Sequence, residues 1–319
     1  MSAYNADKPE EGEVNVYENE EGYVRLLRDI LAIEHVTPDR TGCGTKKTFG
    51  ATLDFTDIAQ GFPLLTGRPV PFRLCFEEMM FFLNGRVQTR ELEDKGIMFW
   101  HGNTRRDFLD GRGLQALPEG HMGYAYGAVM RHAGGDYDEH YQPVGGFDQL
   151  QYVIAELQRD IWSRRAMIEL WSPADIDRMA LTPCCHNYNF AATMGPDGEP
   201  ELNLAVKIRS SDTPFGLGGA NAPQFGFLLQ AMAQLLAVRP KKLSLILIDA
   251  HIYSGGYANQ IPYIEEAVER EIQPLPQLTI DRELHSMADL LALTMADLRF
   301  VNYHPNTAKM LSPRPPMAV

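Results

Sequence analysis

The stretch QFGFLLQAMAQLLAV, residues 224–238, is apolar over almost its whole length. A helix that is hydrophobic around its whole circumference must be covered on every side, so this stretch predicts a helix at the centre of the domain. The segment that follows, LSLILID at 243–249, has the continuous leucine and isoleucine content of a covered strand. Together they predict a buried helix packed against a central sheet.

Helical and strand-like patterns flank this centre. The predicted helices cover 23–35, 73–83, 147–161 and 224–238, and the predicted strands cover 51–55, 166–171, 186–193, 201–208 and 243–249. Proline and glycine make 38–47 a loop, and residues 101–146 lack periodicity, which is typical of an insertion or of functional loops. The mixture predicts an α+β fold with one mixed sheet, formed by a single large domain over 21–319.

Composition excludes several classes of protein. The 319 residues are 45% hydrophobic, enough to bury a core without covalent cross-links, and the formal net charge of -13 argues against a nucleic-acid-binding surface. No stretch approaches the roughly 20 apolar residues of a membrane span, and the acidic beginning of the chain does not resemble a basic leader. We expect a cytoplasmic protein that binds neither nucleic acid nor membrane, with a mobile acidic segment over residues 1–20.

The four cysteines, at 43, 75, 184 and 185, are too few and too irregularly spaced to predict a disulfide framework or a zinc site. Two of them are adjacent in MALTPCCHNYNF, residues 179–190. Buried free cysteine is common, but SRR at 163–165 and IRSSD at 208–212 bring arginines close to them in sequence, and Arg40 lies in a Gly-rich loop. Guanidinium groups that converge on Cys184 would bind a dianionic phosphate and lower the pKa of the thiol.

A series of blocks, in order along the chain, resembles the folate-dependent thymidylate synthase family. The blocks are DRTGCGTKKTFG, GFPLLTGRPVPFRLCFEEMMFFLNG, FWHGNTRRDFLDGRG, SRRAMIELW, MALTPC, RSSDTPFGLGGAN, DAHIYS and the terminal PMAV. The resemblance runs from about residue 22 to the C-terminus. It implies the fold of that family, a homodimer formed through the sheet, and transfer of one carbon from 5,10-methylenetetrahydrofolate to C5 of a pyrimidine nucleoside monophosphate.

The resemblance also implies catalytic roles. Cys184 matches the nucleophile that adds to C6 of the pyrimidine, and Asn221 matches the asparagine that binds the edge of the base. Glu78 and Tyr126 match members of a proton-transfer network. A carboxyl group within an apolar helix is costly to ionise, so the pKa of Glu78 is expected to rise, whereas Glu77 is expected to face outward or form an ion pair.

Binding residues are carried over in the same way. The nucleotide-binding set is Arg40, Arg209, Ser210, Asp212, Asn221, His251 and Tyr253, together with Arg164 and Arg165 of the partner subunit. The folate-binding set is Phe99, Trp100, Asn103, Asp212, Gly216 and the lid residue Val319, and Arg68 lies where the family has a basic residue near the glutamate tail. No residue is assigned to a metal.

Several positions depart from the family. Cys185 takes the place of a histidine, and because neighbouring side chains on a strand point in opposite directions, we expect Cys185 to pack inside the protein. Ile208, Ala220 and Met130 replace glutamine, phenylalanine and tryptophan, and the loop 216–221 has one extra residue.

These departures leave the product open. Methylation of dUMP to dTMP is the main interpretation, since Asn221 suits uracil and both Trp100 and PMAV are retained. Hydroxymethylation of dUMP, dCMP or CMP, with water in place of hydride, is the alternative. A non-catalytic nucleotide-binding module is the third hypothesis.

Overall fold

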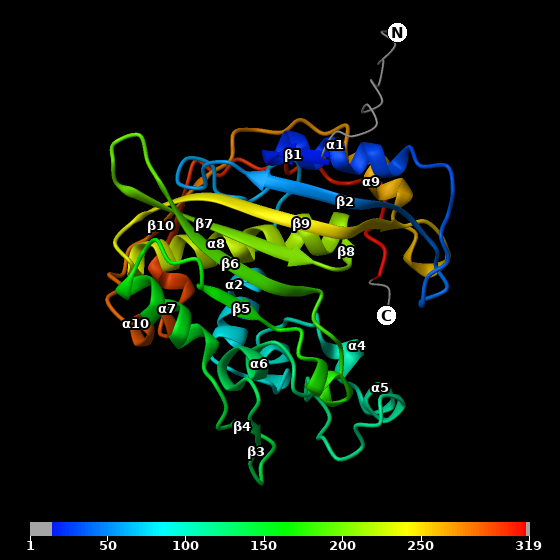
Figure 1. The fold of residues 1–319 in the computed structure, drawn as a ribbon. Helices are drawn as coiled ribbons and strands as arrows, with labels where there is room; N and C mark the ends of the chain where they lie inside the picture. The colour runs from blue at the N-terminus through cyan, green and yellow to red at the C-terminus, as the bar shows by residue number, and fades with distance from the viewer. Residues whose placement is uncertain (1–14, 317–319) are drawn as a thin grey trace.

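The computed structural model describes residues 15–316, and a mixed sheet runs through its centre (Figure 1). Its strands are β1 Asn15–Glu18, β2 Thr45–Phe55, β5 Met167–Glu169, β6 Cys185–Met194, β7 Pro200–Ile208, β8 Ser211–Asp212 and β9 Arg239–Tyr253. Their order is β1-β2-β9-β7-β6-β5, with β8 beside β9. The pairs β1/β2, β7/β9 and β8/β9 are parallel and the others antiparallel, which confirms the predicted mixed sheet.

The helix that the sequence placed at the centre is α8, Ala222–Leu235, and nearly all of its side chains are buried. It lies against β7 and β9, and the second apolar helix, α2 Phe72–Leu83, packs on its other side (Figure 1). Helix α8 ends before residue 238 because Ala237 has a left-handed backbone, with φ 53°, immediately before β9 begins. Among residues 15–316, no helix is both long enough and apolar enough to cross a membrane.

The sheet is covered by helices on one face. Leu243, Leu245 and Leu247 of β9 are completely buried beneath α8, whereas Ile246 is half-buried and Ile248 is 38% exposed on the opposite face. The strand predicted as covered is therefore covered on one side only within the single chain. This alternation leaves an apolar stripe open on the outer face of the sheet.

Residues 15–20, the last part of the segment predicted to be mobile, lie in regular secondary structure. Residues 15–20 form β1 and the first turn of α1 Asn19–Leu31, so the predicted boundary at residue 20 falls inside a helix; residues 1–14 lie outside the described residues. The carboxylate of Glu20 is buried and accepts hydrogen bonds from the backbone N–H groups of Thr66 and Gly67, at 2.7 and 2.8 Å. These bonds hold the start of α1 against the loop before α2.

The region 101–146 is more structured than its sequence suggested. It contains α4 His101–Thr104, α5 Arg106–Gly111, α6 Gly127–His132 and the small hairpin of β3 Asp136–Tyr137 and β4 Pro143–Val144. Helix α7, Gln149–Arg159, then packs beside α6 and is capped by Asp148, whose side chain accepts from the N–H of Gln151. The remaining described elements are α3 Arg90–Glu93, α9 Ile261–Ala267, β10 Gln277–Ile280, α10 Met287–Leu291 and β11 Leu298–Val301. Short helices of one or two turns carry too little periodicity to be recognised from sequence.

Close packing around α8 gives a first prediction. A Cβ atom at Gly226 would lie 2.7 Å from Cδ of Pro63 and 3.1 Å from the ring of Phe62. Gly226→Ala should therefore lower the free energy of unfolding by about 1–3 kcal/mol, although alanine is intrinsically the better helix former by about 1 kcal/mol. Urea unfolding followed by circular dichroism measures the change.

Gly111→Ala is the matched control, because Gly111 closes α5 and has open space where the methyl group would go. This variant should be neutral or gain up to about 1 kcal/mol. Equal stability of the two variants would show that α8 is not packed as tightly as the structure indicates.

Candidate active site

A cleft of about 800 Å³ opens where the loop before β2, the loop before β6 and the ends of β7 and β9 meet. The predicted residues that line it are Arg40, Asn103, Cys184, Arg209, Ser210, His251 and Tyr253. Positions separated by more than 200 residues in sequence are thus brought to one cavity. The four cysteines are free thiols, and among residues 15–316 no cluster of three or more His, Cys, Asp and Glu side chains could hold a metal ion.

Arg209 fixes the segment that carries the thiol. Its Nη2 donates to the carbonyl oxygen and the hydroxyl of Thr182 at 2.9 and 3.0 Å, and its Nε donates to the carbonyl of Pro183 at 3.0 Å. Its backbone N–H donates to the carbonyl of Cys184, and Nη2 also lies 3.7 Å from Sγ of Cys184. One side chain therefore holds three consecutive residues and places a positive charge beside the sulfur.

The electrostatic balance at the thiol differs from the prediction. Burial raises the pKa of Cys184, and the opposing effects of Arg209 and then Arg40 do not reverse this shift. The predicted net lowering of the pKa is wrong, because desolvation of the thiolate outweighs the attraction of two guanidinium groups. The arginines do act in the predicted direction, and they stabilise the thiolate relative to what burial alone would allow.

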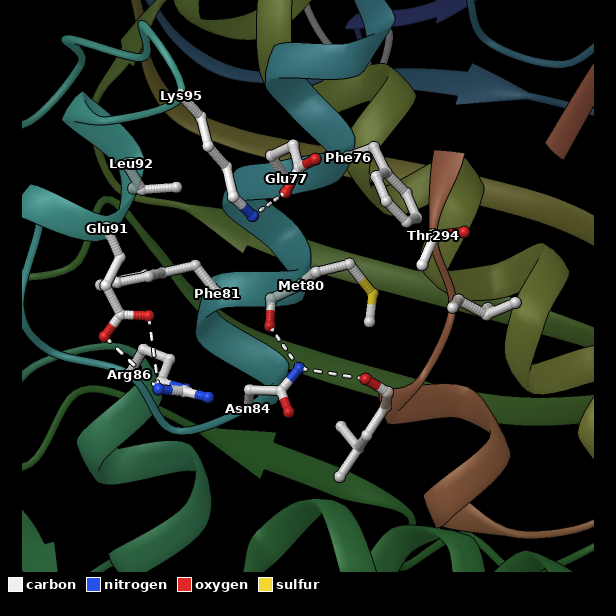
Figure 2. Close-up of a pocket in the computed structure, with 12 residues that line it drawn as sticks. Phe76, Glu77, Met80, Phe81, Asn84, Arg86, Glu91, Leu92, Lys95 and Thr294 are labelled. Carbon is white, nitrogen blue, oxygen red and sulfur yellow. Dashed lines mark hydrogen bonds and ion pairs between the residues drawn. The ribbon is translucent and has the colours of Figure 1, made fainter. Parts of the chain in front are cut away.

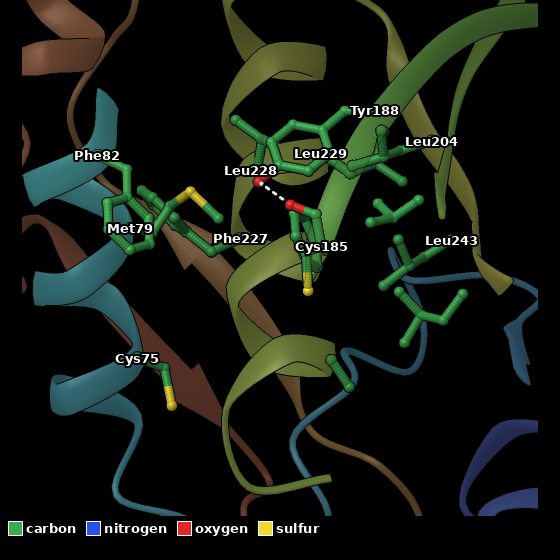
Figure 3. Close-up of a cluster of buried hydrophobic side chains, with 14 of the residues drawn as sticks. Cys75, Met79, Phe82, Cys185, Tyr188, Leu204, Phe227, Leu228, Leu229 and Leu243 are labelled. Atoms are coloured by element: carbon green, nitrogen blue, oxygen red, sulfur yellow. Dashed lines mark hydrogen bonds between the residues drawn. The ribbon is translucent and has the colours of Figure 1, made fainter. Parts of the chain in front are cut away.

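Cys185 points the other way, as predicted. It is 5% exposed and lies in the core among residues of α2 and α8, and its backbone carbonyl accepts from the hydroxyl of Tyr188 (Figure 3). Burial holds the pKa of its thiol well above the usual range. A shift in strand register between Cys185 and Asn187 marks a bulge at His186, which the displaced histidine occupies.

Glu78 is enclosed between α2 and α8. The indole N–H of Trp100 donates to one carboxylate oxygen at 2.6 Å, and the amide of Gln224 donates to the other. Burial raises the pKa of Glu78 to about 7, although both hydrogen bonds oppose the shift. The predicted rise is confirmed, and it places the carboxyl group in the range useful for acid–base chemistry at neutral pH.

The neighbouring Glu77 faces the opposite side of α2. Its carboxylate lies 2.6 Å from Nζ of Lys95, at the rim of a second hollow lined by Phe76, Met80 and Phe81 (Figure 2). The prediction of an ion-paired neighbour is confirmed. At the same rim Arg86 pairs with Glu91, so the charges around this hollow neutralise one another.

Gln224 is a functional candidate that the sequence analysis missed. Besides binding Glu78, its side-chain oxygen accepts from the amide of Asn221 at 3.3 Å. A continuous hydrogen-bonded path therefore connects Trp100, Glu78, Gln224 and Asn221. The available signal was a glutamine at the start of an otherwise apolar helix, which mirrors the glutamate within α2.

Tyr126 connects this path to the nucleophile. Its hydroxyl accepts the backbone N–H of Cys184 at 3.0 Å, and its ring stacks on Phe82 and meets Trp100 edge-on at 5.2 Å. Its backbone has φ 44°, an uncommon conformation for a bulky residue that is typical of functional sites. Burial raises the pKa of the phenol well above its usual range, so the hydroxyl stays protonated at neutral pH.

Asp212, His251 and Tyr253 lie together at the end of the sheet. Asp212 of β8 is paired in register with His251 of β9, and the rings of His251 and Tyr253 are 5.3 Å apart. Nδ1 of His251 is 2.8 Å from a carboxylate oxygen of Asp249. Desolvation raises the pKa of Asp212, which accepts from Gln260 at 3.0 Å.

The predicted folate residues are only partly brought together. Asn103 lines the cleft, whereas Trp100 is 9% exposed and is engaged with Glu78, so it is a supporting residue of the acid–base group as well as a candidate wall. Phe99 is half-buried against the core. A Cβ at Gly216 would meet ordinary contacts of 3.5 and 3.8 Å, so the chain itself does not require glycine there. Val319 lies outside the described residues.

The positions that depart from the family are accommodated locally. Ile208 and Met130 are fully buried, and Ala220 is half-buried. The loop with one extra residue forms a π-helix, Thr213–Asn221, that leads directly into α8. A π-helical turn holds about one more residue than an α-helical turn, so this conformation is compatible with one extra residue before α8.

The region 101–146 contributes residues that the sequence analysis did not assign. The cleft is also lined by Asp107 and Phe108 of α5 and by Arg112, which follows this helix. Arg112 is anchored by hydrogen bonds to the carbonyls of Ile176 and Met179. Arg164 and Arg165 are exposed just before β5 and do not line the cleft of their own chain.

Comparison with known proteins agrees with this geometry. The sequence model of the family described as thymidylate synthase matches residues 21–313. A bifunctional dihydrofolate reductase-thymidylate synthase from Zea mays is 34% identical over 91% of the chain and 54% of its own length. The chain thus spans about half the length of the bifunctional relatives that it matches.

Single-function relatives are covered more completely. A thymidylate synthase of human herpesvirus 8 type P is 35% identical over 89% of the chain and 81% of the viral protein. A thymidylate synthase of Saccharomyces cerevisiae is 32% identical over 92% of the chain and 97% of the yeast protein. With most of its length matched and residues of several of the quoted blocks lining one cleft, the chain belongs to the thymidylate synthase family.

Proposed function

We propose that this protein methylates dUMP to dTMP with 5,10-methylenetetrahydrofolate. The observation that carries the proposal is the placement of Sγ of Cys184 beside Arg209 in the cleft, with its backbone joined through Tyr126 to the environment of Glu78. The relatives named thymidylate synthase support the same activity.

The nucleotide would enter with its phosphate at Arg40, Arg209 and Ser210, which line one cleft with Cys184. Bidentate guanidinium groups suit a dianionic phosphate. A bond from Sγ to C6 makes C5 electron-rich, and the same bond breaks once C5 has been substituted. Arg209 stabilises the attacking and departing thiolate.

The base would lie toward Asn221, whose amide can accept from N3–H and donate to O4 of uracil. Through Gln224, Asn221 is connected to Glu78. With a pKa of about 7, Glu78 can hold or release a proton near this edge of the base at neutral pH. The protein would thus supply both a nucleophile, Cys184, and a poised acid, Glu78.

A cluster around Phe215 of the π-helix, outside the residues that line the cleft, has features that fit a folate. The guanidinium groups of Arg68 and Arg314 lie 5.7 and 4.6 Å from the centroid of the Phe215 ring, and among the described residues neither forms an ion pair with a carboxylate. Two neighbouring cations around an aromatic ring suit an aromatic ligand with an acidic tail. When bound, 5,10-methylenetetrahydrofolate supplies the one-carbon unit and the hydride that completes the methyl group.

We further propose a homodimer formed through the open face of the sheet. Ile246 is half-buried there, and Ile248 and Met167 are 38% and 45% exposed on strands whose other face is buried. Arg164 and Arg165 precede β5 at the edge of this face and point outside their own cleft, which fits a role in the cleft of a partner subunit. An apolar stripe rimmed by charge is typical of a subunit interface.

Product analysis tests the activity. With dUMP and 5,10-methylenetetrahydrofolate, we expect dTMP and an equal amount of dihydrofolate, detected by mass spectrometry and absorbance. Cys184→Ala should lower turnover by at least about 10⁴-fold because covalent activation is lost, while nucleotide binding stays within about threefold.

Cys185→Ala is the matched control, since that thiol lies in the core and should affect stability rather than chemistry. A hydroxymethyl product without dihydrofolate would replace methylation with the hydrolytic alternative, and tests with dCMP and CMP would define the base and sugar. Binding of nucleotide without any turnover by the unmodified protein would favour a non-catalytic module.

The acid–base role of Glu78 gives a pH prediction. Its pKa is about 7 in the folded protein against 4.5 for a glutamate in water, so folding binds a proton between these pH values. The stability that this proton confers is complete below about pH 4.5 and is lost as the pH rises to about 7, a loss on the order of 3 kcal/mol.

Glu78→Gln should abolish this loss, so its free energy of unfolding relative to the unmodified protein should increase from pH 5 to pH 8, and turnover should fall sharply. Glu77→Gln is the control, because its exposed ion pair with Lys95 contributes little. A parallel pH dependence of stability in Glu78→Gln and the unmodified protein would contradict the raised pKa.

Mixing variants tests the dimer. Cys184→Ala and the double variant Arg164→Ala/Arg165→Ala should each be almost inactive alone. After denaturation and refolding together, about a quarter of full activity should return, because half of the dimers are mixed and one of their two sites is intact.

Cys184→Ala mixed with Arg209→Ala is the control, since both residues lie in the cleft of one chain and no site is then intact. If the first mixture forms dimers, as detected by analytical ultracentrifugation, without regaining activity, the result would show that Arg164 and Arg165 act within their own subunit and not in the cleft of the partner.

A further inference from the structure

Trp171 contacts Arg209 and is not among the residues that line the cleft. Cζ of Arg209 is 5.4 Å from the centroid of the Trp171 ring, within the range of a cation–π contact. Trp171 itself is half-buried and does not line the cleft. Among the described interactions, the guanidinium group of Arg209 is the one group of the cleft that Trp171 contacts.

Apart from the ring of Trp171, the side chain of Arg209 is held by hydrogen bonds to one short segment of the chain. Its hydrogen bonds go to Thr182, Pro183 and Cys184, and among the described residues no carboxylate forms an ion pair with it. The arginine and the segment 182–184 therefore hold each other through these hydrogen bonds. The aromatic face of Trp171 supplies a second, independent support.

Trp171 is in turn fixed by a cluster of polar residues. Its backbone N–H donates to Oε1 of Glu169 at 2.9 Å, and the same carboxylate accepts from the Asn187 amide at 2.9 Å and lies 3.2 Å from Nδ1 of His186. The His186 ring meets the indole edge-on, with ring centroids 6.2 Å apart. The bulge that follows Cys185 places His186 in this position.

We propose that Trp171 is a positioning residue that holds the Arg209 guanidinium against Sγ of Cys184 and against the phosphate position, and that Glu169 and His186 fix Trp171 for this task. The negative face of the indole attracts the guanidinium group, whereas an aliphatic side chain of similar size would offer contact without this attraction. The proposal adds a residue outside the cleft to the determinants of thiol reactivity.

The test measures the reactivity of Cys184 directly, without substrates. The test variants alter none of the charged and titratable groups that face the thiol or line its cleft, which are Asp39, Arg40, Lys47, Asp107, Arg112, Tyr126, Cys185, Arg209, Asp249, His251 and Tyr253. The rate of alkylation by iodoacetamide is followed against pH, with the adduct assigned to Cys184 by peptide mass spectrometry. Cys184→Ala provides the blank for the other three thiols.

Trp171→Leu should lower the alkylation rate at neutral pH by about 3- to 10-fold and move the pH midpoint of reaction upward, with rates converging at high pH where the thiol is ionised in both proteins. Trp171→Phe, which keeps an aromatic face, should stay within about twofold of the unmodified protein. Trp171→Met carries the same test if the leucine variant does not fold. Trp162→Leu, at a 45% exposed tryptophan away from the cleft, is the control and should leave the profile unchanged.

The kinetic consequence rests on the proposed function: KM for dUMP should rise in Trp171→Leu together with the loss of thiol reactivity, and both should be restored in Trp171→Phe. The alkylation profile does not depend on turnover, so failure of the proposed function and failure of this inference are distinguishable. An unchanged pH midpoint in folded Trp171→Leu or Trp171→Met, or an equal loss in Trp171→Phe, would overturn the role assigned to Trp171.

Discussion

The structure depends on burial of one carboxyl group between two apolar helices. Glu78 of α2 and Gln224 of α8 are buried polar residues that join these helices, and they satisfy each other by a hydrogen bond. A buried polar group without a partner would cost several kcal/mol, so this pair fixes how α2 and α8 lie against each other. Trp100 completes the coordination of the carboxylate, which links the core to the cleft.

The same burial gives the site its chemistry. Desolvation raises the pKa of both Glu78 and Cys184, but the consequences are opposite. For Glu78, a proton retained near neutral pH makes an acid available. For Cys184, a retained proton removes the nucleophile, and arginine must compensate. The reactivity of the thiol therefore depends on the position of Arg209 as well as on the cysteine. A contact that holds Arg209 in place, such as that with Trp171, then affects this reactivity.

The sequence predicted the parts of the fold that carry strong patterns. The apolar helices α2 and α8, the alternating strand β7 and the gathering of Arg40, Cys184 and Arg209 were anticipated. Prediction failed for two features that depend on the folded structure. The direction of the pKa shift of Cys184 depends on how much water burial removes from the thiol. The π-helix depends on how the backbone accommodates an extra residue. Neither quantity is contained in periodicity or spacing.

The distribution of charge explains how an acidic chain can attract a dianionic ligand. In the cleft, the carboxylate of Asp249 forms an ion pair with Lys47 at 2.7 Å and contacts Nδ1 of His251 at 2.8 Å. Burial opposes the shift, but these two contacts lower the pKa of Asp249. Asp39 is occupied by N–H groups of its own loop, from Thr41 and Gly44.

Arg40, Arg112 and Arg209 form no ion pair with a carboxylate among residues 15–316, so these three cations remain available to an anion although the formal charge of the chain is -13. Local pairing of the carboxylates, rather than net charge, thus decides which ligand the cleft accepts, since charges separated by more than about 8–10 Å are largely screened at physiological ionic strength.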